Sequence, residues 1–136
     1  MLFRSIGDRY NKRHLCALCM LGHAGGLLCL TYADVHPAIT TAMVIAFALL
    51  HGTAWGLRGP FMQAIRADYF GRSAIGMILG LSFMIIVVGQ IGGPMIAGIL
   101  ADMTGNYRAG FTTLALLAGM GSLFFLAARR PERPAA

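Results

Sequence analysis

Four long stretches of the chain contain no charged side chain, and they limit the possible folds more than any other feature. They are residues 15–33, 35–57, 73–101 and 109–128, none of which includes Asp, Glu, Lys or Arg. A helix needs about 20 apolar residues to cross the hydrocarbon core of a bilayer, so each stretch is long enough. Strands of a membrane β-barrel would instead alternate in segments of about ten residues. The sequence therefore predicts an all-α membrane bundle of about four transmembrane helices.

The composition excludes a soluble domain. Only 12% of the 136 residues are charged and 57% are hydrophobic, whereas soluble domains carry roughly a quarter charged residues. Four apolar runs in so short a chain would leave almost no polar surface to meet water. The lipid bilayer is therefore the first expected partner.

The positive charges predict the orientation. Nine Lys and Arg residues flank the runs on one side of the membrane: Arg4, Arg9, Lys12, Arg13, Arg66, Arg72, Arg129, Arg130 and Arg133. Only Arg108 lies on the other side, so the positive-inside rule predicts cytoplasmic termini and a multi-pass protein of the inner (plasma) membrane. These residues form no stripe on a soluble face, so the net charge of +6 does not indicate nucleic-acid binding.

The domain organisation follows from these positions. Residues 1–14 are expected to be a cytoplasmic loop, residues 15–128 a four-helix transmembrane region, and residues 129–136 a cytoplasmic tail. The expected spans are approximately 15–33, 38–64, 74–101 and 109–128.

Arg58 directly follows the second apolar run and lies within the expected span 38–64, where a charge is costly unless it meets a partner or a water-filled cavity. At 100° per residue, His51, Trp55 and Arg58 share one face of a helix, and Gly52, Gly56 and Gly59 occupy the neighbouring face. Arg58 is a candidate to bind an anionic substrate group such as a carboxylate. The alternative is that Arg58 snorkels to the cytoplasmic interface. His51 either couples protons or bonds to a neighbouring helix.

Two prolines interrupt predicted helices. Pro60 follows Gly59 and Pro94 follows Gly93, and each proline removes a backbone hydrogen bond and bends its helix. Such bends serve as hinges in many transporters, although a static kink is the alternative. Gln90, near the middle of the third run, is a candidate to donate to a substrate or to bridge helices.

Small residues at four-residue spacing predict close helix packing. The pairs are Gly22 and Gly26, Gly52 and Gly56, Gly76 and Gly80, and Gly89 and Gly93.

Cys16 and Cys19 form a C-x-x-C pattern in the first run, which raises the possibility of a redox enzyme or metal site. No second ligand pair accompanies them, so packing as small apolar side chains is the preferred interpretation. A haem or metal site would need histidines at matching depth on facing helices, and His14, His36 and His23 are expected at different levels. We therefore predict no enzyme activity, no cofactor and no metal.

Several motifs resemble those of one family of transporters. Gly89, Gly93, Pro94 and Gly98 match a glycine-proline motif of the major facilitator superfamily, and residues 7–13 (GDRYNKR) resemble its cytoplasmic loop motif. A wider resemblance covers nearly the whole chain through residues 55–60, 67–72, 93–98 and 101–107. It is similar to the end of bacterial members near the oxalate/formate and monocarboxylate transporter branch.

The resemblance implies that the four helices are the last four of twelve. It implies structural roles at the cytoplasmic gate for Asp8, Arg9, Asp68, Gly71 and Arg72, and a hinge in the helix of Gly93 and Pro94. The chain is then expected to be a C-terminal fragment of a secondary transporter that moves a small solute, such as an organic anion, by alternating access. Its further partners would be the solute and the missing N-terminal half or another membrane subunit. The alternative is a small stand-alone structural or accessory membrane subunit.

Overall fold

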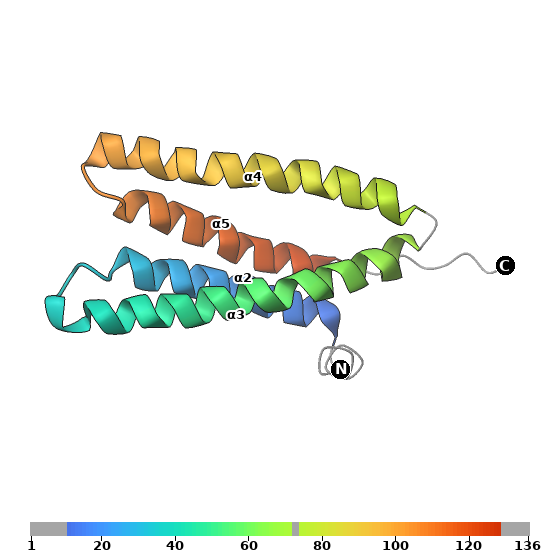
Figure 1. Ribbon diagram of the computed structural model, residues 1–136, viewed down its shortest axis with the longest axis horizontal. Coiled ribbons are helices and arrows are strands. Elements are labelled where there is room, and N and C mark those ends of the chain that lie inside the picture. Colours follow the sequence, from blue (N-terminus) through green and yellow to red (C-terminus); the bar gives the residue numbers. More distant parts are fainter. Residues whose placement is uncertain (1–10, 72–73, 129–136) are drawn as a thin grey trace.

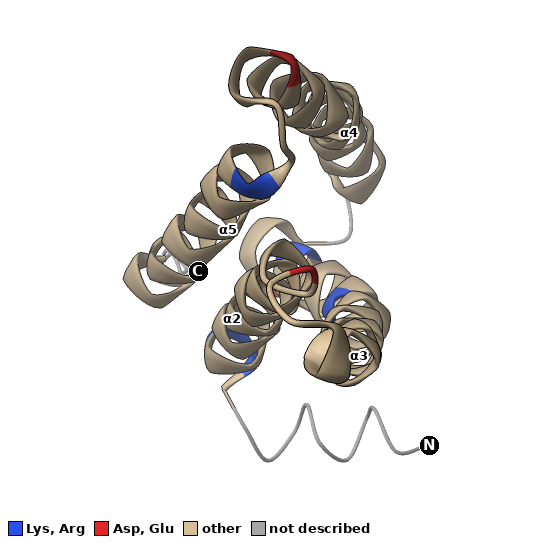
Figure 2. Cartoon of the chain, turned by 90° about the vertical axis from the view of Figure 1, so that its left-hand side faces the viewer, with Lys and Arg blue, Asp and Glu red and all other residues tan. Residues whose placement is uncertain are grey.

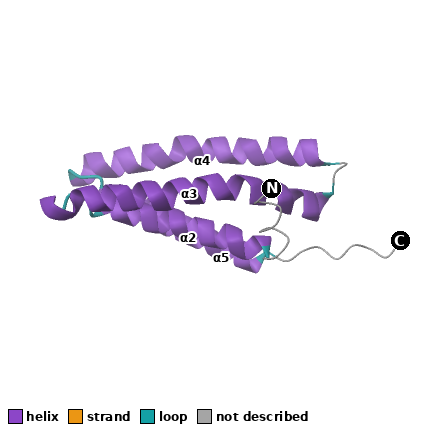
Figure 3. Cartoon of the chain, turned by 60° about the horizontal axis from the view of Figure 1, so that its bottom comes forward, coloured by secondary structure: helices purple, strands orange, loops and turns teal. Residues whose placement is uncertain are grey.

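The computed structural model describes residues 11–71 and 74–128, which form four helices (Figure 1). They are α2 (Lys12–Thr31), α3 (Pro37–Phe70), α4 (Ile75–Thr104) and α5 (Arg108–Ala127). The described residues contain no strand (Figure 3). All four helices are long and apolar enough to cross a membrane. The predicted all-α membrane helix bundle is confirmed.

Local sequence signals explain where the helices begin and end. The Asn11 side chain accepts a hydrogen bond from the backbone N–H of Arg13 at 3.1 Å and so caps α2. His36 caps α3 by accepting from the N–H of Ala38 at 3.2 Å, and Pro37 follows it in the first helical turn. At its other end α3 stops at Gly71, whose φ of 73° and ψ of −179° lie in a region that essentially only glycine adopts.

The helices form two antiparallel hairpins whose turns lie at the same end of the molecule (Figure 1). This end holds the turns 32–36 and 105–107 and is called the hairpin end. At the opposite end, called the basic end, α2 and α4 begin and α3 and α5 finish. Viewed from the hairpin end, the helices show few charged residues along their length (Figure 2).

Helix α2 lies between α3 and α5 and contacts both, while α4 packs mainly on α5. Glycines set the close approaches. A Cβ built on Gly26 would lie 3.3 Å from the backbone nitrogen of His51, and one built on Gly22 would lie 3.2 Å from the Cβ of Ala54. A Cβ on Gly110 of α5 would lie only 2.7 Å from the Cα of Ala97 in α4. The first predicted glycine pair therefore packs α2 onto α3.

The buried residues are small, and the outer surface is apolar. The buried apolar side chains include Cys16, Ala54, Ala97 and Ala115, whereas Met77 and Val88 of α4 are more than two-thirds exposed. This distribution suits a bundle in lipid, where interfaces use small residues for close packing and large apolar side chains meet the acyl chains. Cys16 and Cys19 are free and buried, in agreement with the packing role expected for them.

Helix α3 continues to Phe70, past the expected end of its span at residue 64. Its 34 residues reach about 51 Å at 1.5 Å per residue, well beyond a hydrocarbon core of about 30 Å. Pro60 and Pro94 both lie inside helices that run through them without interruption. The structure therefore contains no break at either proline.

Candidate functional site

Two histidines meet at the interface between α2 and α3. The Nδ1 atoms of His23 and His51 are 3.2 Å apart, so one of these nitrogens carries the hydrogen and donates it to the other. The rings lie edge to face with centroids 4.5 Å apart. The contact is possible because Gly26 brings the α2 backbone against His51. The two histidines thus lie at matching depth on facing helices, and this contact is the bond to a neighbouring helix that was one of the two alternatives for His51.

His23 is almost completely buried, with 5% of its surface exposed. Its second ring nitrogen, Nε2, is also buried and has no hydrogen-bond partner among the described residues. Buried polar atoms usually have a partner, because leaving one unpaired costs about 1–3 kcal/mol. His23 therefore has the capacity for one more polar contact.

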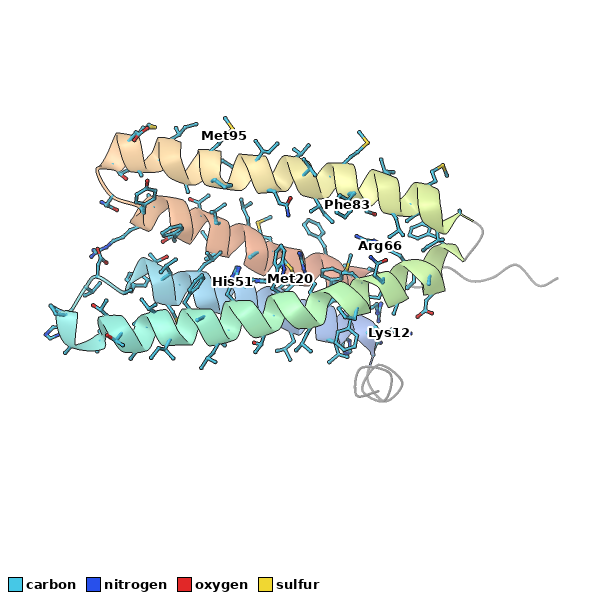
Figure 4. All side chains as sticks on the ribbon, viewed as in Figure 1. Lys12, Met20, His51, Arg66, Phe83 and Met95 are labelled. Atoms are coloured by element: carbon cyan, nitrogen blue, oxygen red, sulfur yellow. The ribbon has the colours of Figure 1, made fainter. Side chains whose placement is uncertain are left out.

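On α3, His51 is followed one turn later by Trp55 and then by Arg58. The His51 and Trp55 rings are stacked, with an interplanar angle of 14° and centroids 6.5 Å apart. The Cζ atom of Arg58 lies 5.0 Å from the centre of the Trp55 ring, a cation–π geometry. The structure thus brings the predicted site residues His51, Trp55 and Arg58 together on one side of α3 and adds His23 from α2. Figure 4 labels His51 of α3 and Met20 of α2, both near the middle of the length of the bundle.

The Arg58 side chain extends toward the hairpin end. Trp55, over which its guanidinium lies, precedes it in α3 and is therefore farther from the basic end. Helical side chains tilt toward the N-terminus of their helix, which for α3 is the hairpin end. The Arg58 side chain therefore points away from the basic end, whereas snorkelling to that end would require it to point toward it.

Arg58 forms no ion pair with any of the described residues. Of the acidic groups among these residues, Asp68 pairs with Lys12 at 2.7 Å and Asp34 with Arg108 at 3.1 Å. Asp102 lies near the hairpin end of α4 and is exposed. The described part of the bundle therefore supplies no carboxylate for the Arg58 guanidinium.

Gln90, the other substrate candidate, lies on α4 and is exposed. The structure records no hydrogen bond between it and the His51, Trp55 and Arg58 group within the described residues. Of the glycines on the same helix, Gly93 faces Leu114 of α5, with 3.9 Å from its built Cβ to a Leu114 methyl, while Gly89 has open space beside it. A Cβ built on Gly98 would likewise meet nothing within 4 Å.

Two of the predicted gate residues, Asp68 and Gly71, lie among the described residues. Asp68 joins the end of α3 to the start of α2 through Lys12, and Gly71 ends α3. Arg13 Nη1 also donates to the carbonyl of Ala128, which ties α2 to the end of α5. The other predicted gate residues, Asp8, Arg9 and Arg72, lie outside the described residues, as do the loop 1–10 and the tail 129–136.

At the proline site of α3, Gly59 has open space beside it and Pro60 is exposed.

His23 is the one member of the group that sequence reasoning missed. The helical periodicity of α3 identifies the shared face of His51, Trp55 and Arg58, but it carries no information about which α2 residues face it. The available signal was local, because Gly22 and Gly26 mark the packing face of α2 and His23 lies between them.

Comparison with known proteins identifies the family. A family model described as the Major Facilitator Superfamily matches residues 1–136. The chain is 32% identical over 119 residues to monocarboxylate transporter 12 of Xenopus laevis, covering 85% of this chain and 24% of that protein. It is 38% identical over 94 residues to monocarboxylate transporter 13 of Rattus norvegicus, covering 68% of this chain and 22% of that protein.

A bacterial relative, multidrug resistance protein 2 of Bacillus subtilis, is 24% identical over 121 residues, covering 89% of this chain and 29% of the relative. The chain thus spans about a quarter of the length of these curated relatives. No solved structure matches it. The predicted resemblance is confirmed over all 136 residues, and the chain belongs to the major facilitator superfamily.

Proposed function

We propose that this chain is the C-terminal part of a secondary transporter that moves a small organic anion across the inner (plasma) membrane by alternating access. The family match over the whole chain is the observation that carries this proposal. The relatives, of which the chain spans about a quarter, include proteins named as monocarboxylate transporters. The proposed partners are the solute and an N-terminal transporter half or another membrane subunit.

The orientation proposed places the basic end in the cytoplasm. Lys12 and Arg13 begin α2 at this end, and Arg66 lies near the same end of α3 (Figure 4). The hairpin end has Arg108 as its only Lys or Arg among the described residues, and Asp34 binds it. The asymmetry supports cytoplasmic termini by the positive-inside rule.

The solute is proposed to bind beside Arg58. A guanidinium within a spanning helix needs an anionic partner or water, and the described residues provide no carboxylate for it. Its direction toward the hairpin end favours an interior partner over snorkelling. An anionic solute would supply the missing charge while bound, with Trp55 and His51 beside it. Gln90 would contribute only if α4 moved closer to α3 during the cycle.

Alternating access needs one part of the bundle to move against another. Helix α2 is held to α3 and α5 at the basic end by Lys12 and Arg13, and we propose that Lys12 and Asp68 form part of the cytoplasmic gate. Helix α4 is held mainly by α5, so it is the element proposed to move, with Gly93 and Pro94 as its hinge and Gly59 and Pro60 as a second flexible point in α3.

An uptake assay tests the proposal. The complete reading frame that contains these residues would be reconstituted into liposomes and offered radiolabelled lactate, benzoate and succinate. We expect saturable uptake of at least one anion that Arg58→Gln abolishes and Arg66→Gln leaves intact. Absence of flux for every anion offered, with correctly inserted protein, would refute it.

A small accessory subunit is the second candidate. The open glycine faces favour it, because a Cβ built on Gly52, Gly56 or Gly80 would meet nothing within 4 Å in the described structure. Such faces suit docking against another membrane protein. Sequencing the gene upstream of Met1 separates the two candidates: a continuous frame with further apolar segments supports the transporter, and a stop codon with a ribosome-binding site supports the subunit.

A further inference from the structure

Three flat rings follow one another along α3 and end at Arg58. Phe47, His51 and Trp55 are spaced four residues apart, which places them on one face of the helix. The Phe47 and His51 centroids are 5.1 Å apart with an angle of 31° between the rings, and those of His51 and Trp55 are 6.5 Å apart with an angle of 14°. We call Phe47, His51 and Trp55 the ring row.

The last ring of the row is open. Trp55 is 54% exposed although it lies within a candidate membrane span. Its neighbour Arg58 holds a guanidinium 5.0 Å from the ring centre and has no carboxylate partner among the described residues. A partly exposed aromatic side chain and a cation with no carboxylate partner in the described part of the chain therefore lie about one helical turn apart.

We infer that this place binds an aromatic monocarboxylate, with the carboxylate on Arg58 and the flat ring against Trp55. The inference rests on the proposed function, since it names the class of solute. The guanidinium presents paired N–H donors that match a carboxylate in a two-bond geometry. Aromatic rings prefer aromatic partners to saturated ones of equal size, because their edges and faces carry complementary partial charges.

His23 acts as the positioning residue of this site. Its Nδ1 lies 3.2 Å from the Nδ1 of His51, which fixes the ring that stacks on Trp55. His23 also lies 6.0 Å from Trp55, edge to face at 76°. Helix α2 thus holds the ring row in place, while only residues of α3 contact the solute.

The chain carries its own reporter of binding, because Trp55 is its single tryptophan. The purified 136-residue chain would be titrated in detergent micelles with phenylacetate, cyclohexylacetate and phenylacetamide while Trp55 fluorescence is recorded. Cyclohexylacetate keeps the carboxylate and removes the flat ring, and phenylacetamide keeps the ring and removes the charge. We expect phenylacetate to bind about two- to tenfold more tightly than cyclohexylacetate, and phenylacetamide to bind more weakly than either.

Variants of Arg58 and Arg66 test which arginine binds the carboxylate. Arg58→Gln is expected to weaken phenylacetate binding about ten- to 100-fold, the loss typical of a hydrogen bond to a charged group. Arg58→Lys keeps the charge without the paired donors, so its affinity for phenylacetate should lie between those of the parent and Arg58→Gln. It is the variant to measure if Arg58→Gln fails to fold by circular dichroism. Arg66→Gln, on the same helix nearer the basic end, is the matched control and should bind like the parent (Figure 4).

The inference is overturned if cyclohexylacetate binds as well as phenylacetate, or if neither Arg58 variant changes the affinity. His23→Ala should reduce the preference for phenylacetate over cyclohexylacetate, while Arg58 still binds both carboxylates. Liposome uptake separates this inference from the proposed function. Uptake of aliphatic anions without uptake of phenylacetate would refute the aromatic class of solute alone. Phenylacetate binding reported by Trp55, without uptake of any anion, would refute the transport proposal alone.

Discussion

Gly26 offers the sharpest test of how α2 and α3 fit together. A Cβ at this position would lie 3.2 Å from the Cβ of His51 and 3.3 Å from its backbone nitrogen. Carbon atoms pack best at about 3.5–4.0 Å, so Gly26→Ala must separate the helices by a few tenths of an ångström. The neighbouring Gly25 is the matched control, because its Cβ would meet only a Leu50 methyl at an ordinary 3.8 Å.

The expected magnitude follows from two opposing effects. Both substitutions gain helix propensity, up to about 1 kcal/mol each, and this term cancels in the comparison. Overpacking a tight contact costs about 1–3 kcal/mol, and only Gly26→Ala carries this cost. Gly26→Ala should therefore be about 1–3 kcal/mol less stable than Gly25→Ala, which is roughly five- to 150-fold in the unfolding equilibrium constant.

The assay is a reversible titration with dodecyl sulfate in mixed micelles, followed through Trp55 fluorescence. Trp55 suits the measurement because it stacks on His51, the residue that an alanine at position 26 would push. Equal midpoints for the two variants, or a more stable Gly26→Ala, would refute the close approach of the two helices.

The other predictions concern the helix ends and the proposed hinge. A double-mutant cycle of Lys12→Gln and Asp68→Asn should give a coupling of no more than about 1 kcal/mol that falls with added salt, because both side chains are partly exposed; a salt-independent coupling would contradict this. Gly71→Ala should destabilise by about 1–3 kcal/mol in the same dodecyl sulfate titration, since its backbone conformation is nearly confined to glycine, while Gly52→Ala, with open space, serves as its control. Pro94→Ala should slow anion uptake in liposomes while equilibrium binding at Trp55 stays unchanged, and unaltered uptake would remove the hinge role.

The helices themselves were predictable because bilayer crossing depends on run length and charge, both visible in the sequence. The end of α3 at Phe70 was less visible. Arg66 and Asp68 follow the expected span 38–64 and mark its limit, but a helix also continues through water where its residues favour it. Hydropathy locates the membrane and does not locate the last hydrogen-bonded turn.

The site was predictable only along one helix. Helical periodicity placed His51, Trp55 and Arg58 on a common face, and the structure brings these three together. The partner His23 depends on the register between α2 and α3, which Gly22 and Gly26 set through close contacts. No single-helix pattern contains that register, so the histidine pair had to come from the three-dimensional arrangement.

The position of α2 has a consequence for synthesis in the cell. Helix α2 is made before the other three, yet it packs against α5, which is made last. Met20 of α2, for example, meets Gly121 of α5, where a built Cβ would lie 2.8 Å from its terminal methyl. Until the ribosome has finished α5, this side of α2 lacks the helix against which it packs. A ribosome stalled after α4 would therefore hold a membrane-inserted hairpin of α2 and α3 beside an α4 that still lacks the helix on which it mainly packs.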